Sequence, residues 1–189
     1  PLRWLLVLAL VGSIGVVGMF KVNMLKEYQK DRLTAFIDPS ADPEGRGYTY
    51  NARQALIAIG SGGVTGKGYL RGTQTNLQYV PEQKTDFVFT VVGEELGFTG
   101  AMLLLGLLGL LAWRGLRIAA VARDPFGALI AAGVVSMLVF QAFVNVGMTI
   151  GIMPITGIPL PFVSYGGSSL VASFLAVGLL ENVHMRRYL

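Results

Sequence analysis

The sequence predicts an all-α integral membrane protein with about four transmembrane helices and one long extracytoplasmic loop, and three observations lead to this fold class. Hydrophobic residues make up 53% of the 189 residues and charged residues only 14%, whereas a soluble domain carries about 25% charge. The mean hydropathy is +0.59, and the 25 glycines are typical of membrane helices. Four apolar runs approach or exceed the roughly 20 residues that cross a bilayer core. These features exclude a disordered chain, a disulfide scaffold and an ordinary cytosolic enzyme.

The apolar runs and the polar residues that close them divide the chain into helices and connections. Transmembrane helices are expected at residues 1–20, 87–113 (including a start at the outer surface), 126–150 and 166–183. Connections are expected at residues 21–86, 114–125, 151–165 and 184–189. The first connection is predicted to hold turns and short interfacial helices. Because the chain starts at Pro1 and runs directly into an apolar stretch, we expect it to be the later part of a longer protein.

Basic residues in the short connections predict the orientation of the helices. Arg3, the segment Arg114–Arg123 and the pair Arg186–Arg187 fall on one side of a four-helix path, which is interpreted as cytoplasmic. The 21–86 loop and the re-entrant-like 151–165 loop then face outward together, so chemistry built from both takes place at the outer face. Flanking arginines and contact with membrane lipids explain the net charge of +4, so no nucleic-acid partner is expected.

Two cations lie in a glycine-rich part of the outer loop. Glycines in the segment Val64–Gly72 allow the backbone to approach another group closely, and Lys67 and Arg71 supply positive charge. The segment is therefore a candidate for binding a phosphorylated substrate. A flexible loop with solvated cations explains the same residues, and the motif does not decide between the two interpretations.

A carboxylate, Asp86, stands immediately before an apolar run and two residues after Lys84. Partial desolvation raises the pKa of a carboxyl group and a nearby cation lowers it, so the position is a candidate for chemistry. A helix N-cap is the structural alternative. Glu94 and Glu95 follow on the same predicted helix, where they should face protein as ion-pair partners or face a water-filled cavity.

The segment 151–170 is apolar but is interrupted by three prolines, so we expect it to be buried in protein near membrane depth, where broken helices often line sites. Its end combines hydroxyl groups, glycines and a helix start, which suit an anion as well as they suit plain capping and close packing. The residues concerned are Ser164, Gly166, Gly167 and Ser168.

A polar stripe lies on the third predicted transmembrane helix. Gln141, Asn145 and Thr149 repeat every four residues and therefore share one helix face. Hydrogen bonds to neighbouring helices explain such a stripe, and a polar cavity is the alternative.

Missing residue types exclude several chemistries. The sequence has no Cys, and its single histidine, His184, lies beside the cytoplasmic arginines. A Ser-His-Asp triad, a His-ligated zinc site and a Cys nucleophile at the outer face are therefore excluded from this chain. A carboxylate base or nucleophile remains, with Lys or Arg binding a phosphorylated substrate. A divalent cation, Mg²⁺ or Mn²⁺, stays open as a cofactor, although the sequence has no dedicated ligand cluster.

Two groups of motifs carry a family resemblance. The first group comprises Gly66–Gly68, Gly72–Gln74, Val80–Phe89 and Gly93–Gly97, and the second is the segment Pro159–Ser169. Together they resemble the SEDS family (shape, elongation, division and sporulation proteins), and the Gly-Thr-Gln and Pro-Glu-Gln variants resemble its elongation branch. One departure is visible, because Lys84 stands where members commonly have His.

The resemblance implies a fold of about ten spans, with this chain as the C-terminal part, and a peptidoglycan glycosyltransferase that polymerises lipid II at the outer face of the bacterial cytoplasmic membrane. Asp86 matches the family's essential aspartate and is the expected general base. A class B penicillin-binding protein is the implied partner. The residues expected to bind the diphosphate of the substrate are Lys67, Arg71, Lys84, Ser164, Gly166, Gly167 and Ser168. The residues expected to support the site are Glu94, Glu95, Gln141 and Asn145.

Two other functions compete with this one. A flippase or transporter of the lipid-linked precursor would use the proline-broken segment and the intramembrane carboxylates. A non-catalytic scaffold for the penicillin-binding protein would need the outer loop but not Asp86. The concentration of charged residues at the outer face favours surface chemistry over transport.

Overall fold

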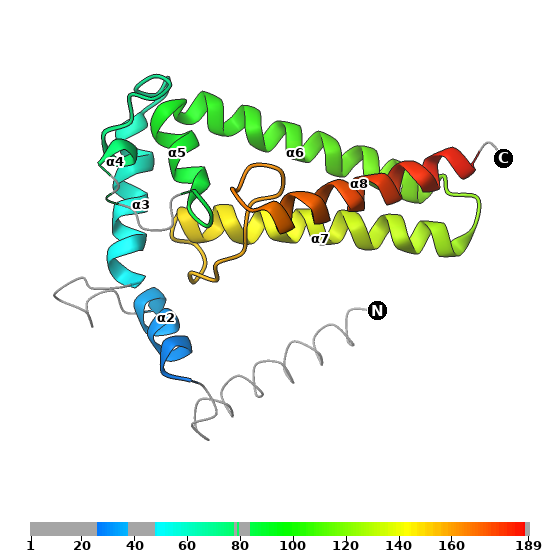
Figure 1. Cartoon of the computed structure of the whole chain (residues 1–189), viewed down its shortest axis with the longest axis horizontal. Coiled ribbons are helices and arrows are strands. Elements are labelled where there is room, and N and C mark those ends of the chain that lie inside the picture. Colours follow the sequence, from blue (N-terminus) through cyan, green and yellow to red (C-terminus); the bar gives the residue numbers. More distant parts are fainter. Residues whose placement is uncertain (1–25, 38–47, 78, 80–83, 188–189) are drawn as a thin grey trace.

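The computed structural model describes residues 26–37, 48–77, 79 and 84–187, and these form helices joined by turns and loops, without a strand. The predicted first transmembrane helix at residues 1–20 lies outside the described residues. The all-helical membrane fold expected from the sequence is confirmed. Figure 1 shows three long helices side by side and several short helices gathered at the end of the bundle where α6 begins.

Three helices are long and apolar enough to cross a membrane, which makes the chain a multi-pass membrane protein. They are α6 (Gly97–Ala120), α7 (Pro125–Thr149) and α8 (Gly167–Arg186). Their shared core lies near the ends of α6 and α8, where Ala131 and Val135 pack against Leu180 and Val183. A Cβ at Gly115 would overlap the side chain of Val135, so glycine lets α6 approach α7 closely at this core.

The connection between α6 and α7 is shorter than expected. Helix α6 continues past Arg114 to Ala120, and only residues 121–124 separate it from α7. Ile118 and Ala119 pack against the shared core, so the helix continues beyond Trp113, where the uncharged run ends. Arg114 and Arg117 remain exposed on it, because long basic side chains can reach out from an apolar helix end.

Helix α7 starts with a complete N-terminal cap. Asp124 Oδ2 accepts a hydrogen bond of 2.8 Å from the backbone N–H of Gly127, and Pro125 occupies the first turn. Both features are typical of helix starts, because the first N–H groups have no partner within the helix.

The expected helix from residue 87 onward is two helices. Helix α5 (Val88–Glu95) ends before Gly97, which has a φ of +66° and begins α6. A Cβ at Gly97 would overlap the backbone nitrogen of Gly66. The loop carbonyls of Gly63 and Val64 accept hydrogen bonds from the N–H groups of Phe98 and Thr99, at 2.9 and 3.1 Å. The loop after α3 thus caps α6 and fixes the break.

Short helices build the end of the molecule at which α6 begins. These are α2 (Glu27–Ile37), α3 (Tyr48–Gly62) and α4 (Thr73–Asn76). Figure 1 shows α3 lying across the end of the long helices, beside α5. A small core joins α3, the start of α5, α7 and the loop after α7 through Ala55, Phe87, Met148 and Ile155. This packing places the residues before α5 against the 151–166 loop.

Candidate functional site

The turn that precedes α5 is held by its backbone against the loop that precedes α8. The carbonyl oxygen of Lys84 accepts a hydrogen bond of 2.8 Å from the N–H of Tyr165. The next carbonyl, of Thr85, accepts one of 2.5 Å from Ser164 Oγ. Ser164 is buried, and its hydroxyl also accepts a hydrogen bond of 2.8 Å from the N–H of Leu160. Two segments about 80 residues apart in the chain are therefore fixed to each other beside Asp86.

The third consecutive carbonyl, of Asp86 itself, is held from α7. Asn145 Nδ2 donates 2.8 Å hydrogen bonds to the carbonyl oxygens of Asp86 and Ile158. Asn145 is fully buried, and its carbonyl oxygen Oδ1 has no hydrogen-bond partner in the described part of the chain. One amide group thus joins the transmembrane helix, the turn of Asp86 and the 151–166 loop.

The carboxylate of Asp86 lies against Gly157. Gly157 has a φ of +76°, and a Cβ placed on it would lie 3.1 Å from Asp86 Oδ2. Glycine therefore provides both the left-handed backbone and the space for the carboxylate. The alternative role of Asp86 as a helix cap is wrong, because the N-cap of α5 is Phe87 and no side chain caps this helix. The side chain of Asp86 is half-buried.

The start of α8 lies beside this turn but is not capped by a hydroxyl group. Its N-cap is Gly166, without a side-chain hydrogen bond, and Gly167 and Ser168 are exposed. The first N–H groups of a helix without a side-chain cap are open to water or a ligand. Ser164, expected to contact an anion, instead holds the two loops together.

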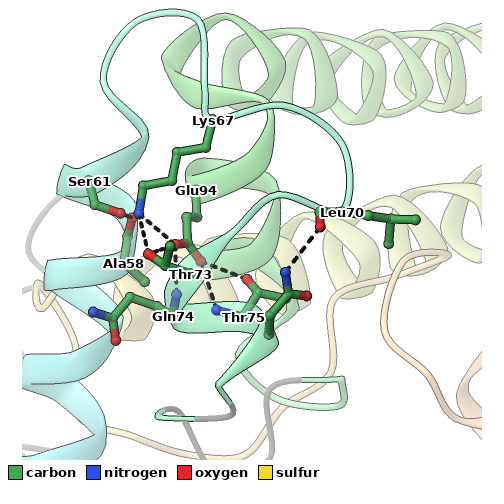
Figure 2. Close-up of polar contacts among 9 residues, drawn as sticks. Ala58, Ser61, Lys67, Leu70, Thr73, Gln74, Thr75 and Glu94 are labelled. Carbon is green, nitrogen blue, oxygen red and sulfur yellow. Dashed lines mark hydrogen bonds and ion pairs between the residues drawn. The ribbon is translucent and has the colours of Figure 1, made fainter.

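A second polar cluster surrounds Glu94 at the other end of α5, as Figure 2 shows. Glu94 is fully buried, and its Oε1 lies 2.8 Å from Lys67 Nζ in a salt bridge. Oε1 also accepts hydrogen bonds from Thr73 Oγ1 at 3.3 Å and from the N–H of Gln74 at 2.9 Å. Oε2 accepts two from Thr75, at 2.9 Å from N–H and 2.7 Å from Oγ1. The carboxylate thus binds the whole 67–75 loop to α5.

These contacts determine the ionisation of Glu94. Burial by itself raises the pKa of the Glu94 carboxyl, but the hydrogen bonds from Lys67, Thr75 and the backbone of the loop outweigh it and lower the pKa to about 2. Glu94 therefore stays charged at neutral pH. An ion pair of this kind, surrounded by hydrogen-bond donors, holds a loop in one conformation.

The expected site residues therefore fall into two groups. Asp86, Lys84, Ser164 and Asn145 meet at the start of α5, whereas Lys67 and Glu94 meet at its end. Eight residues at a rise of about 1.5 Å place these two groups roughly 12 Å apart. Arg71 is exposed in the loop, Glu95 is buried beside Glu94, and Gln141 is half-buried one helical turn before Asn145.

Sequence reasoning missed Arg32. Arg32 lies on α2, and its guanidinium donates a 3.1 Å hydrogen bond to the carbonyl of Thr156, the neighbour of Gly157. It also lines a cavity of about 180 Å³ between α2, α3 and the loop after α7. The charged stretch around Arg32 has no hydrophobic pattern that predicts this contact.

In the described part of the chain, no group of three or more acidic or histidine side chains is arranged to hold a metal ion.

The fold and this arrangement define a class of membrane protein. The chain belongs to the FtsW/RodA/SpoVE family, described as cell cycle proteins, which matches residues 1–189. It is 44% identical over 187 residues to the peptidoglycan glycosyltransferase MrdB of Escherichia coli K12, covering 98% of this chain and 50% of MrdB. It is 48% identical over 170 residues to the peptidoglycan glycosyltransferase RodA of Treponema pallidum, covering 90% of this chain and 39% of RodA.

A solved structure shares the fold. It is described as showing structural coordination of polymerization and crosslinking by a peptidoglycan synthase complex, and it matches with a TM-score of 0.75 and 35% identity over 100% of this chain and 51% of that chain. The present chain thus spans about half the length of the relatives it matches. The family expected from the sequence is confirmed.

Proposed function

We propose that the protein is a peptidoglycan glycosyltransferase that polymerises lipid II at the outer face of the bacterial cytoplasmic membrane during cell elongation. Curated relatives at 44% and 48% identity carry that activity in their names. The observation that supports the site is the backbone of residues 84–86, where three consecutive carbonyls are held from two other segments and leave the Asp86 carboxylate against Gly157.

In the proposed reaction Asp86 is the general base. Its carboxylate takes the proton from the 4-hydroxyl of the acceptor sugar while that oxygen forms a bond to the anomeric carbon of the donor. The bond from the anomeric carbon to the diphosphate oxygen breaks, and undecaprenyl diphosphate leaves. A base held in a fixed position favours such a transfer, because misplacement by about 1 Å can reduce the rate of a positioned reaction 100-fold.

The leaving diphosphate needs positive charge, and the groups nearest to Asp86 are the candidates to supply it. Lys84 lies two residues before Asp86, the uncapped start of α8 lies beside the same turn, and Arg32 contacts the neighbour of Gly157. Lys67 has a different proposed role, because its ammonium binds Glu94 at the far end of α5. A Lys67→Met variant is thus expected to leave the KM for lipid II unchanged.

A class B penicillin-binding protein is the proposed partner, and the outer loop is its proposed contact. The related structure combines polymerization with crosslinking in one complex. The outer loop exposes four large apolar side chains next to the Glu94 cluster, and such patches on a surface are typical of protein interfaces. They are Val64, Tyr69, Leu70 and Leu77.

The test of the proposed function is polymerisation of lipid II by the full-length protein with its penicillin-binding partner, whose transpeptidase site is blocked. Asp86→Asn is expected to lower the rate at least about 100-fold. The matched control is Asp124→Asn, the same chemical change at the opposite end of the bundle, where Asn caps a helix as well as Asp does. Equal rates for Asp86→Asn and the wild type, at equal melting temperature, would remove Asp86 from the mechanism.

A further inference from the structure

The end of the bundle opposite Asp86 holds a basic cavity that the proposed function does not use. It lies between α6 and α8 and has a volume of about 590 Å³. Pockets of about 300 to 1,000 Å³ are typical of sites for small ligands. The polar side chains with ionisable groups that line it are Arg114, Arg117, Glu181, His184 and Arg187.

The charge of the cavity is positive, since three arginines face one carboxylate. Arg114 and Arg117 lie one turn apart on α6, both exposed. The guanidinium of Arg117 lies 4.5 Å from the centre of the Trp113 ring, an arrangement that orients the cation. Two neighbouring guanidinium groups are well suited to a phosphate, because their planar donors bind oxygen atoms in pairs.

The apolar part of the cavity lies on its membrane side. Leu111 precedes Arg114 by one turn of α6, and Val177 precedes Glu181 by one turn of α8. Both helices run toward this end, so these apolar walls lie nearer the middle of the bundle than the charges do. Trp113 is exposed at the same level, and tryptophan is enriched at the height of lipid headgroups. The cavity is therefore cationic at the end of the bundle and apolar toward its middle. This order matches a phospholipid, whose anionic headgroup lies at the membrane surface and whose acyl chains point to the membrane centre.

We propose that this cavity binds one anionic phospholipid of the cytoplasmic leaflet. The lipid phosphate contacts Arg114 and Arg117, and an acyl chain follows Leu111 and Val177 toward the middle of the membrane. Basic pockets between transmembrane helices at the cytoplasmic side bind anionic lipid headgroups in other membrane proteins. The apolar wall favours a lipid over free phosphate, because free phosphate has no acyl chain to contact this wall. The inference does not depend on Asp86 or on glycosyl transfer.

Thermal melting of the full-length protein in neutral detergent, titrated with dioleoylphosphatidylglycerol, tests the proposal. Neutral detergent removes the surface charge of a bilayer and so reduces the attraction between the lipid and distant arginines. The lipid is expected to raise the melting temperature at concentrations at least about tenfold lower than dioleoylphosphatidylcholine does. Inorganic phosphate at the same concentrations is expected to have no such effect.

The decisive comparison is between two double variants that remove the same charge. Arg114→Gln/Arg117→Gln is expected to weaken the stabilisation by phosphatidylglycerol at least about tenfold. Arg123→Gln/Arg186→Gln, at exposed positions of the same end that do not line the cavity, is expected to change it less than about twofold. Melting temperatures without lipid show whether each variant is folded.

Three outcomes overturn the proposal. Equal weakening by both double variants would show a general effect of charge. Equal stabilisation by inorganic phosphate would show a phosphate site without a lipid. Absence of any preference for phosphatidylglycerol in the wild type would show that the cavity does not select an anionic phospholipid. An Arg114→Lys/Arg117→Lys variant, which keeps the charge but loses the paired donors, is expected to fall between the wild type and the Gln variant.

Discussion

Asn145 donates a 2.8 Å hydrogen bond from its side-chain amide to the backbone carbonyl of Asp86, across 59 positions of the chain. The same amide nitrogen reaches the carbonyl of Ile158, also at 2.8 Å. Since only the nitrogen of an Asn amide carries hydrogen atoms, its orientation follows from these two acceptors. A residue in the middle of a transmembrane stripe thus positions the proposed catalytic turn through its backbone.

Replacing Asn145 by Ala is expected to reduce turnover more than substrate binding. The change leaves two half-buried carbonyls without their donor, which costs about 2 kcal/mol of folding free energy, and it loosens the turn of Asp86. We expect kcat for lipid II polymerisation to fall about 10- to 100-fold, with little change in KM. Steady-state kinetics of the full-length protein measure both constants.

Thr149→Val is the matched control for Asn145→Ala. Thr149 is also fully buried on α7, but its hydroxyl donates to the carbonyl of Val146 in its own helix. It should lower the melting temperature and leave kcat nearly unchanged. If kcat falls equally in both variants, Asn145 acts only through stability.

Acidification is expected to release the 67–75 loop through Glu94. The pKa of Glu94 is lowered in the fold from 4.5 to about 2, so the stabilisation it gives is complete above pH 4.5 and is lost as the pH falls toward 2. The shift corresponds to about 3 kcal/mol at most. Melting temperatures of the wild type should fall across this window.

Glu94→Gln is expected to be less stable at pH 7 and to lose less of its melting temperature on acidification, because its side chain does not titrate. Glu181→Gln, an exposed position, is the control and should follow the wild type. A Glu94→Gln variant with the same pH profile as the wild type would show that other carboxyl groups govern the acid lability.

The long helices could be predicted from the sequence because burial in lipid requires long apolar runs, and α7 and α8 begin within a residue of the expected positions. The break before Gly97 could not, because it depends on a contact with Gly66 from a loop about 30 residues away. The Asp86 motif lies at the turn before α5, and its role as the site stays a prediction. Its attachment to Asn145 and Ser164, and the pairing of Lys67 with Glu94, depend on tertiary packing that no local pattern encodes.

Gly157 and Gly151 offer a test of the space around the Asp86 carboxylate. They lie in one loop with nearly the same backbone, at φ of +76° and +75°. Alanine is therefore strained by about 1 kcal/mol at either position. A Cβ at Gly151 meets only the Leu56 side chain, at an ordinary 3.6 Å, whereas a Cβ at Gly157 meets Asp86 Oδ2 at 3.1 Å.

Gly157→Ala is therefore expected to reduce kcat about tenfold or more relative to Gly151→Ala, at a similar loss of melting temperature. The reason is that the added methyl group moves the carboxylate by a few tenths of an ångström, beyond the positional tolerance of a general base. Kinetics and melting of the two variants side by side measure the difference. Equal kcat values would mean that the carboxylate adjusts to the methyl group, and that the close contact with Gly157 does not position Asp86 for catalysis.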